Sequence, residues 1–172
     1  SMPQVHIVAY CADLGYGVAR GAEMLSLMLA FGIISRVGSG FVADRIPDGA
    51  CLQTGIGAIP NAIMTALSHH RDLGVHTELL SDGLVDLVEK GVVNGVRKLH
   101  NRTKVVGTFA LGTRRLYDFL HENTAVELWS ARYVIDPRLL SRERNFVSIN
   151  ATLTVDFLGQ CASETLNGKY YS

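Results

Sequence analysis

The sequence is poor in cysteine, proline and tryptophan and carries no net charge. Its 172 residues include 3 Cys, 4 Pro and 1 Trp, and 16 basic residues balance 16 acidic ones. An odd number of widely spaced cysteines argues against a disulfide framework and is typical of a reducing cytosol. A balanced charge gives no support for nucleic acid or an acidic membrane as a partner. We therefore expect a cytoplasmic protein that buries a hydrophobic core.

Residue clusters that could hold a metal and apolar runs that could span a bilayer are also absent from the sequence. His69 and His70 are adjacent and would point apart on a helix, and no Cys/His pair has the spacing of a zinc site. The apolar run of residues 22–35 contains one charge, Glu23, and is shorter than the about 20 residues of a membrane span. We therefore predict no metal site and no membrane partner.

What the sequence does contain is a glycine loop within residues 52–62. An apolar, strand-like start leads to Gly55 and Gly57, and Pro60 then opens a helical pattern. Two glycines so close together indicate a sharp turn whose backbone N–H groups are free to face a ligand. Proline suits the first helical position, because that N–H has no intrahelical partner. On its own this pattern is a weak signal, and a purely structural turn explains it equally well.

A second stretch, residues 73–83, ends a short strand in the carboxylate of Glu78. Ser81 and Asp82 follow, and we expect them to cap a helix. Chemistry alone favours Glu78 as a solvated residue at a strand end. We expect His76 to pack or hydrogen-bond locally, and Trp129 to lie in the core.

Strands and helices alternate from Pro47 onward, which predicts an α/β fold with a mainly parallel sheet. Gly91 is expected just after the end of a short helix. The expected strands lie at residues 50–54, 104–110, 126–129, 146–151, 153–157 and 160–163, and helices are expected after Pro60, Asp82, Thr113 and Asp136.

Four motifs occur in order: GIGAIP at 55–60, LGVHTELLSDG at 73–83, VSIN at 147–150 and VDFLGQ at 155–160. With them the chain resembles the acetyl-CoA hydrolase/transferase family from about Ile46 onward, and within it the 4-hydroxybutyrate CoA-transferases. The resemblance implies a partial CoA-transferase-type (NagB/RpiA-like) sheet with flanking helices. It also implies that CoA moves between an acyl-CoA and a short-chain carboxylate through a glutamyl-CoA thioester.

The same resemblance assigns roles to individual residues. It makes Glu78 the nucleophile and places the oxyanion and CoA contacts in the loop of Gly55, Ile56, Gly57 and Ala58, with the Ile56 N–H as first choice. In the family, an upstream domain and a C-terminal glycine-rich segment complete the cleft, and this sequence shows neither, which leaves activity open. The alternative is an inactive remnant that acts as an oligomeric binding module, and a homo-oligomer is expected.

Residues 3–45 differ in character from the rest. Apolar residues within 24–34 recur at spacings typical of one buried helical stripe. Residues 3–45, with a G-x-x-x-D-R element at 40–45, resemble a fragment of a major facilitator transporter. We therefore predict two segments of unrelated origin, 1–45 and 46–172. The alternatives are an apolar helix packed on the following domain and, if the run continues through Arg36, a membrane anchor.

Overall fold

The computed structural model describes residues 22, 23, 26, 38–55, 57–152, 154–163, 165, 166, 169 and 170. The chain divides into two compact units, residues 1–40 and 41–172. In the first unit the described residues are few, and all of them are helical. Most of the predicted apolar helix, and with it the transporter-like fragment and the membrane anchor, lies outside the described residues. Within the part that is described, no helix has both the length and the apolar character to cross a membrane.

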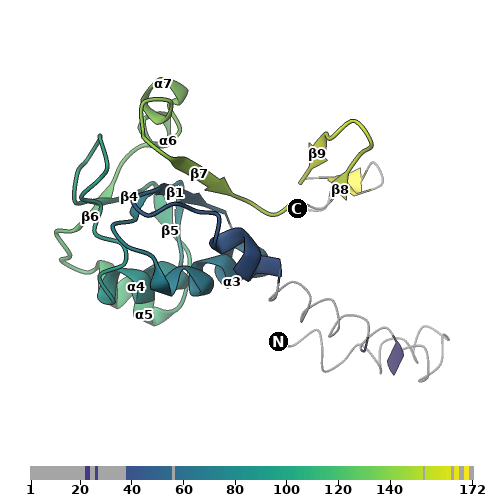
Figure 1. Cartoon of the computed structure of the whole chain (residues 1–172), viewed down its shortest axis with the longest axis horizontal. Helices are drawn as coiled ribbons and strands as arrows, with labels where there is room; N and C mark the ends of the chain where they lie inside the picture. Colours follow the sequence, from purple (N-terminus) through teal and green to yellow (C-terminus); the bar gives the residue numbers. More distant parts are fainter. Residues whose placement is uncertain are drawn as a thin grey trace. The chain divides into compact units, whose positions relative to one another are not determined.

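The second unit is built on a five-stranded sheet (Figure 1). Its strands are β1 (Cys51–Thr54), β2 (Gly74–His76), β4 (Val105–Gly107), β6 (Val126–Leu128) and β7 (Phe146–Ile149). Their order is β6-β4-β2-β1-β7, and all the pairings are parallel. The strand order reverses beside β1, because β2, β4 and β6 follow on one side of it and β7 on the other. The predicted mainly parallel sheet is confirmed.

Helices connect these strands and flank the sheet, as predicted. On one face lie α3 (Ala58–Ala66), extended by the 3-10 turn η1 (Leu67–His69), α4 (Asp82–Glu89) and α5 (Arg114–Leu120) (Figure 1). The connection from β6 to β7 carries two short helices, α6 (Ala131–Val134) and α7 (Pro137–Leu140), on the other side.

Short strands form three further pairs. The strand β3 (Leu79–Leu80) pairs in parallel with β5 (Phe109–Ala110). Two antiparallel pairs follow near the C-terminus, β8 (Thr154–Val155) with β9 (Cys161–Ala162) and β10 (Thr165–Leu166) with β11 (Lys169–Tyr170). The single strand predicted over 104–110 is therefore wrong. It divides at Thr108 into β4 and β5, because the chain there leaves β2 and pairs with β3 instead.

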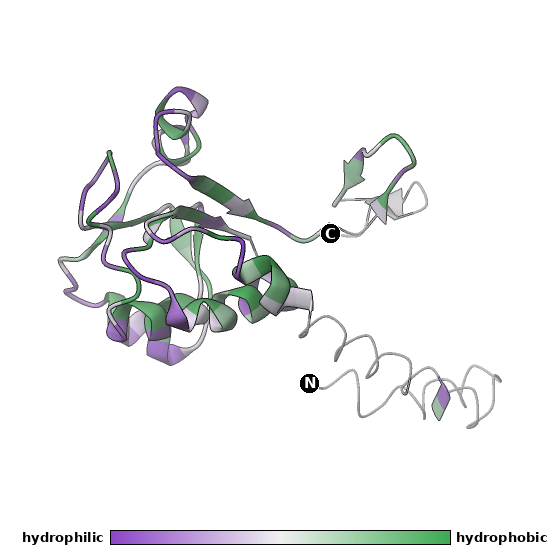
Figure 2. Cartoon of the chain, in the orientation of Figure 1, coloured by the Kyte–Doolittle hydropathy of each residue, from purple (hydrophilic) through white to green (hydrophobic). Residues whose placement is uncertain are grey.

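An apolar core lies between the sheet and the helices α3 and α4. Register places Leu52 beside Val75 and Val75 beside Val105, so these side chains share one face of the sheet. The helices contribute Met64, Leu67, Leu84 and Leu87. Figure 2 shows apolar residues along these strands and along the helix surfaces that face them. Ala43 and Ile46 are buried in the same cluster, at 0% and 5% exposure, so the core of the second unit begins before Ile46.

The helix ends confirm some of the predicted signals and correct others. Gly91 follows α4 with φ 73°, and its N–H and that of Val92 bond to the carbonyls of Val88 and Leu87. This pair of bonds is the Schellman motif, so the prediction for Gly91 is confirmed. Pro60 is the third residue of α3 and not the first. The third N–H of a helix also lacks an intrahelical partner, which explains why proline is accepted there.

Asp82 does not cap its own helix, and this prediction was wrong. Ser81 is the N-cap residue of α4, without a side-chain bond. The Asp82 carboxylate instead accepts from the backbone N–H of Thr113, at 3.1 and 3.0 Å, and from its hydroxyl at 2.7 Å. Thr113 is the N-cap of α5, so Asp82 joins the starts of α4 and α5.

Candidate active site

The sequence-predicted site residues lie at the carboxyl end of the parallel sheet. Gly55 follows β1, Glu78 follows β2 by two residues, and Asn150 follows β7. In open α/β sheets, ligands bind outside the carboxyl ends of the strands, at the point where strand order reverses. Here that point lies between β1 and β7. The glycine loop is therefore at the reversal point, and Glu78 is one strand away.

A pair of threonines joins the ends of β1 and β2. The buried hydroxyl of Thr77 accepts from the Thr54 N–H at 3.0 Å and donates to the Thr54 carbonyl at 2.9 Å. Glu78 is the next residue, and its own carbonyl accepts from the N–H groups of Thr108 and Phe109, at 2.9 and 3.2 Å. The backbone of Glu78 is thus held between β1 on one side and the β4–β5 connection on the other.

The side chain of Glu78, in contrast, is exposed. Within the described residues its carboxylate makes no hydrogen bond and no ion pair. Thr108 lies close by in space, and its buried hydroxyl has no hydrogen-bond partner in that same part of the structure. A free carboxylate on a fixed backbone suits a nucleophile, and it also suits the solvated strand-end residue that the chemistry alone favours.

The two glycines of the loop are constrained in different ways. A Cβ on Gly55 would contact the amide oxygen of Asn150, so that side chain would have to move. Gly57 has φ 129° and ψ 177°, a backbone region that is essentially restricted to glycine, and it is the N-cap of α3. Ile56, the expected oxyanion donor, lies outside the described residues. Ala58 begins α3, and its side chain is likewise not described, so the roles of both remain predictions.

An exposed polar network lies beside this loop, and sequence reasoning missed it. Asn150 donates to Oε1 of Gln53 at 2.9 Å and to Oγ of Ser148 at 3.0 Å, and Gln53 donates to Oδ1 of Asn150 at 3.2 Å. Ser148 also donates to Gln53. The sequence placed Ser148 and Asn150 on an alternating strand but not beside Gln53. The signal that could have found the network is the presence of polar residues at or just after the ends of two strands, since Gln53 and Ser148 are the penultimate residues of β1 and β7.

His76 and Lys98 are buried on the face of the sheet opposite the main core. His76 Nε2 lies 3.0 Å from the Val134 carbonyl, and the pKa of His76 falls to about 4, first because burial disfavours the imidazolium and then because Lys98 is nearby. Lys98 donates to the carbonyls of Val75 and Lys104, at 2.8 and 2.9 Å, and burial lowers its pKa. His76 therefore packs and bonds locally, as predicted.

The environment of Cys51 excludes it as a nucleophile, and Trp129 lies at the surface and not in the core. Burial raises the pKa of the Cys51 thiol to about 12, so it is a core residue and not a nucleophile. Trp129 is 47% exposed, and its prediction as a core residue was wrong. It follows the edge strand β6, its indole N–H donates to the Glu127 carboxylate at 3.0 Å, and its ring lies against that of Tyr133.

Among the described residues no group of acidic, histidine and cysteine side chains could hold a metal ion.

Comparisons with known proteins support the family that the motifs indicate. Residues 112–172 match the acetyl-CoA hydrolase/transferase C-terminal domain. The chain is 52% identical to succinyl-CoA:cyclohexane-1-carboxylate CoA transferase of Geobacter metallireducens, over 77% of this chain and 30% of the relative. It is 39% identical to 4-hydroxybutyrate coenzyme A transferase of Clostridium kluyveri, over 95% of this chain and 38% of the relative.

Solved structures are also similar to this chain, and one of them is a CoA-transferase. RipA from Yersinia pestis is similar with a TM-score of 0.74 and 46% identity, over 77% of this chain and 30% of that one. The 4-hydroxybutyrate CoA-transferase from Porphyromonas gingivalis has a TM-score of 0.70 and 39% identity, over 74% and 33%. This chain therefore spans about a third of the length of these relatives.

The transporter-like resemblance of residues 3–45 finds no support in these comparisons. The similarity to the Clostridium protein covers 95% of this chain, which leaves out too few residues to avoid the segment before Ile46. At least part of that segment therefore aligns with a CoA transferase.

Proposed function

We propose that this chain carries the nucleophile-bearing part of a CoA-transferase, in which Glu78 takes CoA from an acyl-CoA and passes it to a short-chain carboxylate. The observation that carries the proposal is the setting of Glu78. Its carboxylate is exposed while its backbone is fixed by the Thr77–Thr54 bonds and by Thr108 and Phe109. The similarity to CoA transferases with different acyl groups supports the reaction class and leaves the acyl group open.

The proposed reaction proceeds through two kinds of covalent intermediate. An oxygen of Glu78 attacks the thioester carbon, the C–S bond breaks, and CoA leaves as the thiolate, so that the acyl group forms an anhydride with Glu78. The thiolate then attacks the Glu78 carbonyl carbon and releases the acyl group as a carboxylate, which leaves a glutamyl-CoA thioester. An incoming carboxylate attacks this thioester, and the same two steps in reverse order give the new acyl-CoA and free Glu78.

The glycine loop would supply what a carboxylate nucleophile lacks. Each attack places negative charge on a carbonyl oxygen, and one preorganised N–H donor there is worth about 3–4 kcal/mol of transition-state stabilisation. The loop from Gly55 to Ala58 leads from the end of β1 into the N-terminus of α3, where backbone N–H groups lack intrahelical partners. We assign the oxyanion to this loop, with the Ile56 N–H as the donor. A rigid backbone at Glu78 adds the positioning that such reactions need.

Trapping the glutamyl thioester tests this proposal. The 172-residue chain is incubated with acetyl-CoA or butyryl-CoA and treated with hydroxylamine, and peptides are mapped by mass spectrometry. We expect a hydroxamate at Glu78 and none in Glu78→Gln. Glu122→Gln is the matched control, because Glu122 is also an exposed glutamate in a loop, and it should leave the yield unchanged. Absence of modification at Glu78, under conditions in which a full-length relative is modified, would contradict the proposal.

A second function, an inactive module that associates with copies of itself, is favoured by exposed apolar side chains. Leu111, Leu128 and Ile135 are 55%, 57% and 54% exposed. Where exposed apolar side chains form one contiguous patch, they mark a site of association. Light scattering distinguishes the two functions when combined with the trapping experiment. A stable oligomer with no adduct at Glu78 supports the module, whereas an adduct supports the transferase in either oligomeric state.

A further inference from the structure

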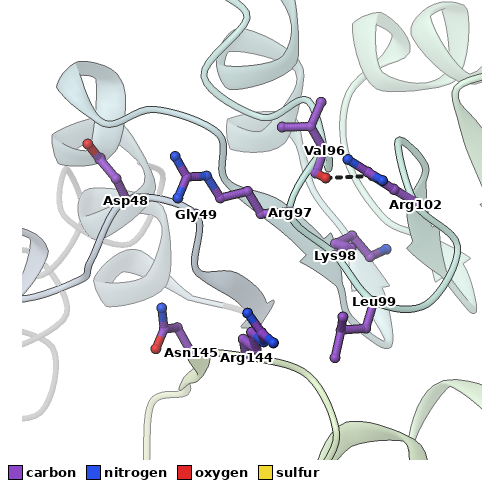
Figure 3. Close-up of a pocket in the computed structure, with 9 residues that line it drawn as sticks. All are labelled: Asp48, Gly49, Val96, Arg97, Lys98, Leu99, Arg102, Arg144 and Asn145. Atoms are coloured by element: carbon purple, nitrogen blue, oxygen red, sulfur yellow. Dashed lines mark hydrogen bonds between the residues drawn. The ribbon is translucent and has the colours of Figure 1, made fainter.

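A cavity of about 420 Å³ lies at the amino end of the sheet, at the opposite end of the strands from Glu78 (Figure 3). It is lined by residues that lead into three strands. Asp48 and Gly49 precede β1, Arg97 and Arg102 lie in the loop before β4, and Arg144 precedes β7. A volume in the range of about 300–1,000 Å³ is typical of a small-molecule site. The position excludes this cavity from the chemistry proposed for Glu78.

The cavity has an excess of guanidinium groups. Figure 3 shows Arg97 and Arg102 on the loop before β4 and Arg144 on the segment before β7. Arg144 makes no hydrogen bond or ion pair with the described part of the chain. Arg102 uses its Nε to donate to the Val96 carbonyl at 2.7 Å, and its terminal nitrogens make no further bond within the same residues. Two guanidinium groups thus have donors available for a ligand.

The acidic residues nearby are already engaged. Asp48 accepts from the Arg71 N–H at 2.9 Å and pairs with His70 at 3.3 Å, and the hydrogen bond from Arg71 is the main reason that its pKa is lowered. Asp72 pairs with Arg97 at 3.3 Å and accepts from Asn94. Asp48 is the one carboxylate among the residues that line the cavity, and three arginines line it as well. The lining therefore carries an excess of positive charge.

The backbone also shapes this site around Arg97. Gly49 has φ 77°, and a Cβ there would contact the stem of Arg97. The glycine therefore leaves room for the stem of Arg97 to cross the backbone at this point. The packing of the stem against Gly49 and the bond from Arg97 to Asp72 together hold the Arg97 guanidinium at a defined position. A preorganised arginine loses less entropy when it binds an anion.

We propose that this cavity binds the phosphate group of a phosphorylated small molecule. Arginine presents paired N–H donors that match the oxygens of a phosphate, and bidentate contacts of this kind are strong. Arg144 and Arg102 supply the free donors, and Arg97 adds charge to the same opening. The cavity volume leaves room for a group attached to the phosphate. The site is separate from Glu78, so binding does not require the transferase chemistry.

Calorimetric titration of the 172-residue chain at low salt tests this proposal, with inorganic phosphate, pyrophosphate, ADP and adenosine as probes. We expect saturable binding of one pyrophosphate or ADP, weakened by salt, and no binding of adenosine. Arg144→Gln and Arg102→Gln should each weaken binding about tenfold or more, because each removes a charge-assisted hydrogen bond to the phosphate. Equal affinity for pyrophosphate and ADP indicates that the phosphate alone is recognised, and tighter binding of ADP indicates a nucleotide.

Arg142→Gln is the matched control. Arg142 is an exposed arginine two residues from Arg144 and does not line the cavity, so its loss removes the same charge and should leave the affinity within twofold. Glu78→Gln should bind as tightly as the unmodified chain, which separates this site from the proposed transferase site. Three results would overturn the proposal: no saturable binding at millimolar pyrophosphate or ADP, equal weakening by Arg142→Gln, or binding of adenosine as tight as that of ADP.

Discussion

Two buried charges at the amino end of the parallel sheet contrast with two exposed polar side chains at its carboxyl end. At the amino end, Lys98 and Glu143 are 4% and 7% exposed, and both are bonded to backbone groups. At the carboxyl end, Glu78 and Asn150 are exposed. A charge can leave water only if the protein satisfies its hydrogen bonds, whereas an exposed group remains available to a ligand. Substitutions of the buried Lys98 and Glu143 should therefore change stability, and substitutions of the exposed Glu78 should change reactivity.

The largest expected effect on stability is at Glu143. Its carboxylate accepts from the N–H groups of Leu99 and His100, at 3.0 and 2.8 Å, and pairs with the His100 ring. Glu143→Ala leaves these two N–H groups without an acceptor, which should lower the free energy of unfolding by about 1–3 kcal/mol for each donor. Urea denaturation measures the change. Asp118→Ala, which breaks only an exposed pair with Arg114, should have a far smaller effect. Equal losses in the two variants would break the comparison between buried and exposed charge.

His76 predicts how stability depends on pH. Its pKa is about 4 in the folded protein and 6.5 in the unfolded chain, so between these two pH values the unfolded chain binds a proton that the folded chain does not. The stabilisation is fully present above pH 6.5 and is lost as the pH falls toward 4. It amounts to on the order of 3 kcal/mol. Denaturation at several pH values should show this decline, and His76→Gln should reduce it. An identical decline in the variant would contradict the assignment.

Two glycines with positive φ allow an effect on stability to be separated from an effect on the reaction at Glu78. Gly57 belongs to the proposed oxyanion loop, and Gly91 ends α4. Gly57→Ala should be strained by about 1–3 kcal/mol and should strongly reduce the adduct at Glu78. Gly91→Ala should cost about 1–2 kcal/mol of stability and leave the adduct unchanged per folded molecule. Melting temperature and adduct yield, measured on both variants, decide the point. A full adduct yield in Gly57→Ala would remove the loop from the mechanism.

Local sequence signals predicted much of the fold. Gly91 was found because a helix end needs a residue with positive φ, and the start of α7 was found because Asp136 precedes a proline and accepts from the Arg138 N–H at 2.9 Å. The mainly parallel sheet followed from the alternation of strands and helices. These features depend on residues close together in the chain, which is why the sequence alone could identify them.

Features that depend on distant residues could not be predicted in this way. Asp82 bonds to Thr113, which lies 31 residues away. The polar network joins Gln53 to Asn150, which lies 97 residues away, through the register of β1 and β7. The split at Thr108 arises because β5 pairs with β3. The identity of Glu78 as a candidate nucleophile came from the motif, since an exposed strand-end carboxylate has no distinctive local pattern.

The central claim, that Glu78 is the nucleophile, is tested most directly by following oxygen atoms. The chain is incubated with acyl-CoA and with acetate that carries ¹⁸O in both carboxyl oxygens, and the peptide that contains Glu78 is analysed by mass spectrometry. When CoA passes to the labelled acetate through the anhydride, one acetate oxygen remains on the glutamate. We predict ¹⁸O in the side chain of Glu78 and in no other carboxylate. Transfer of CoA to acetate with no label at Glu78 would contradict this account.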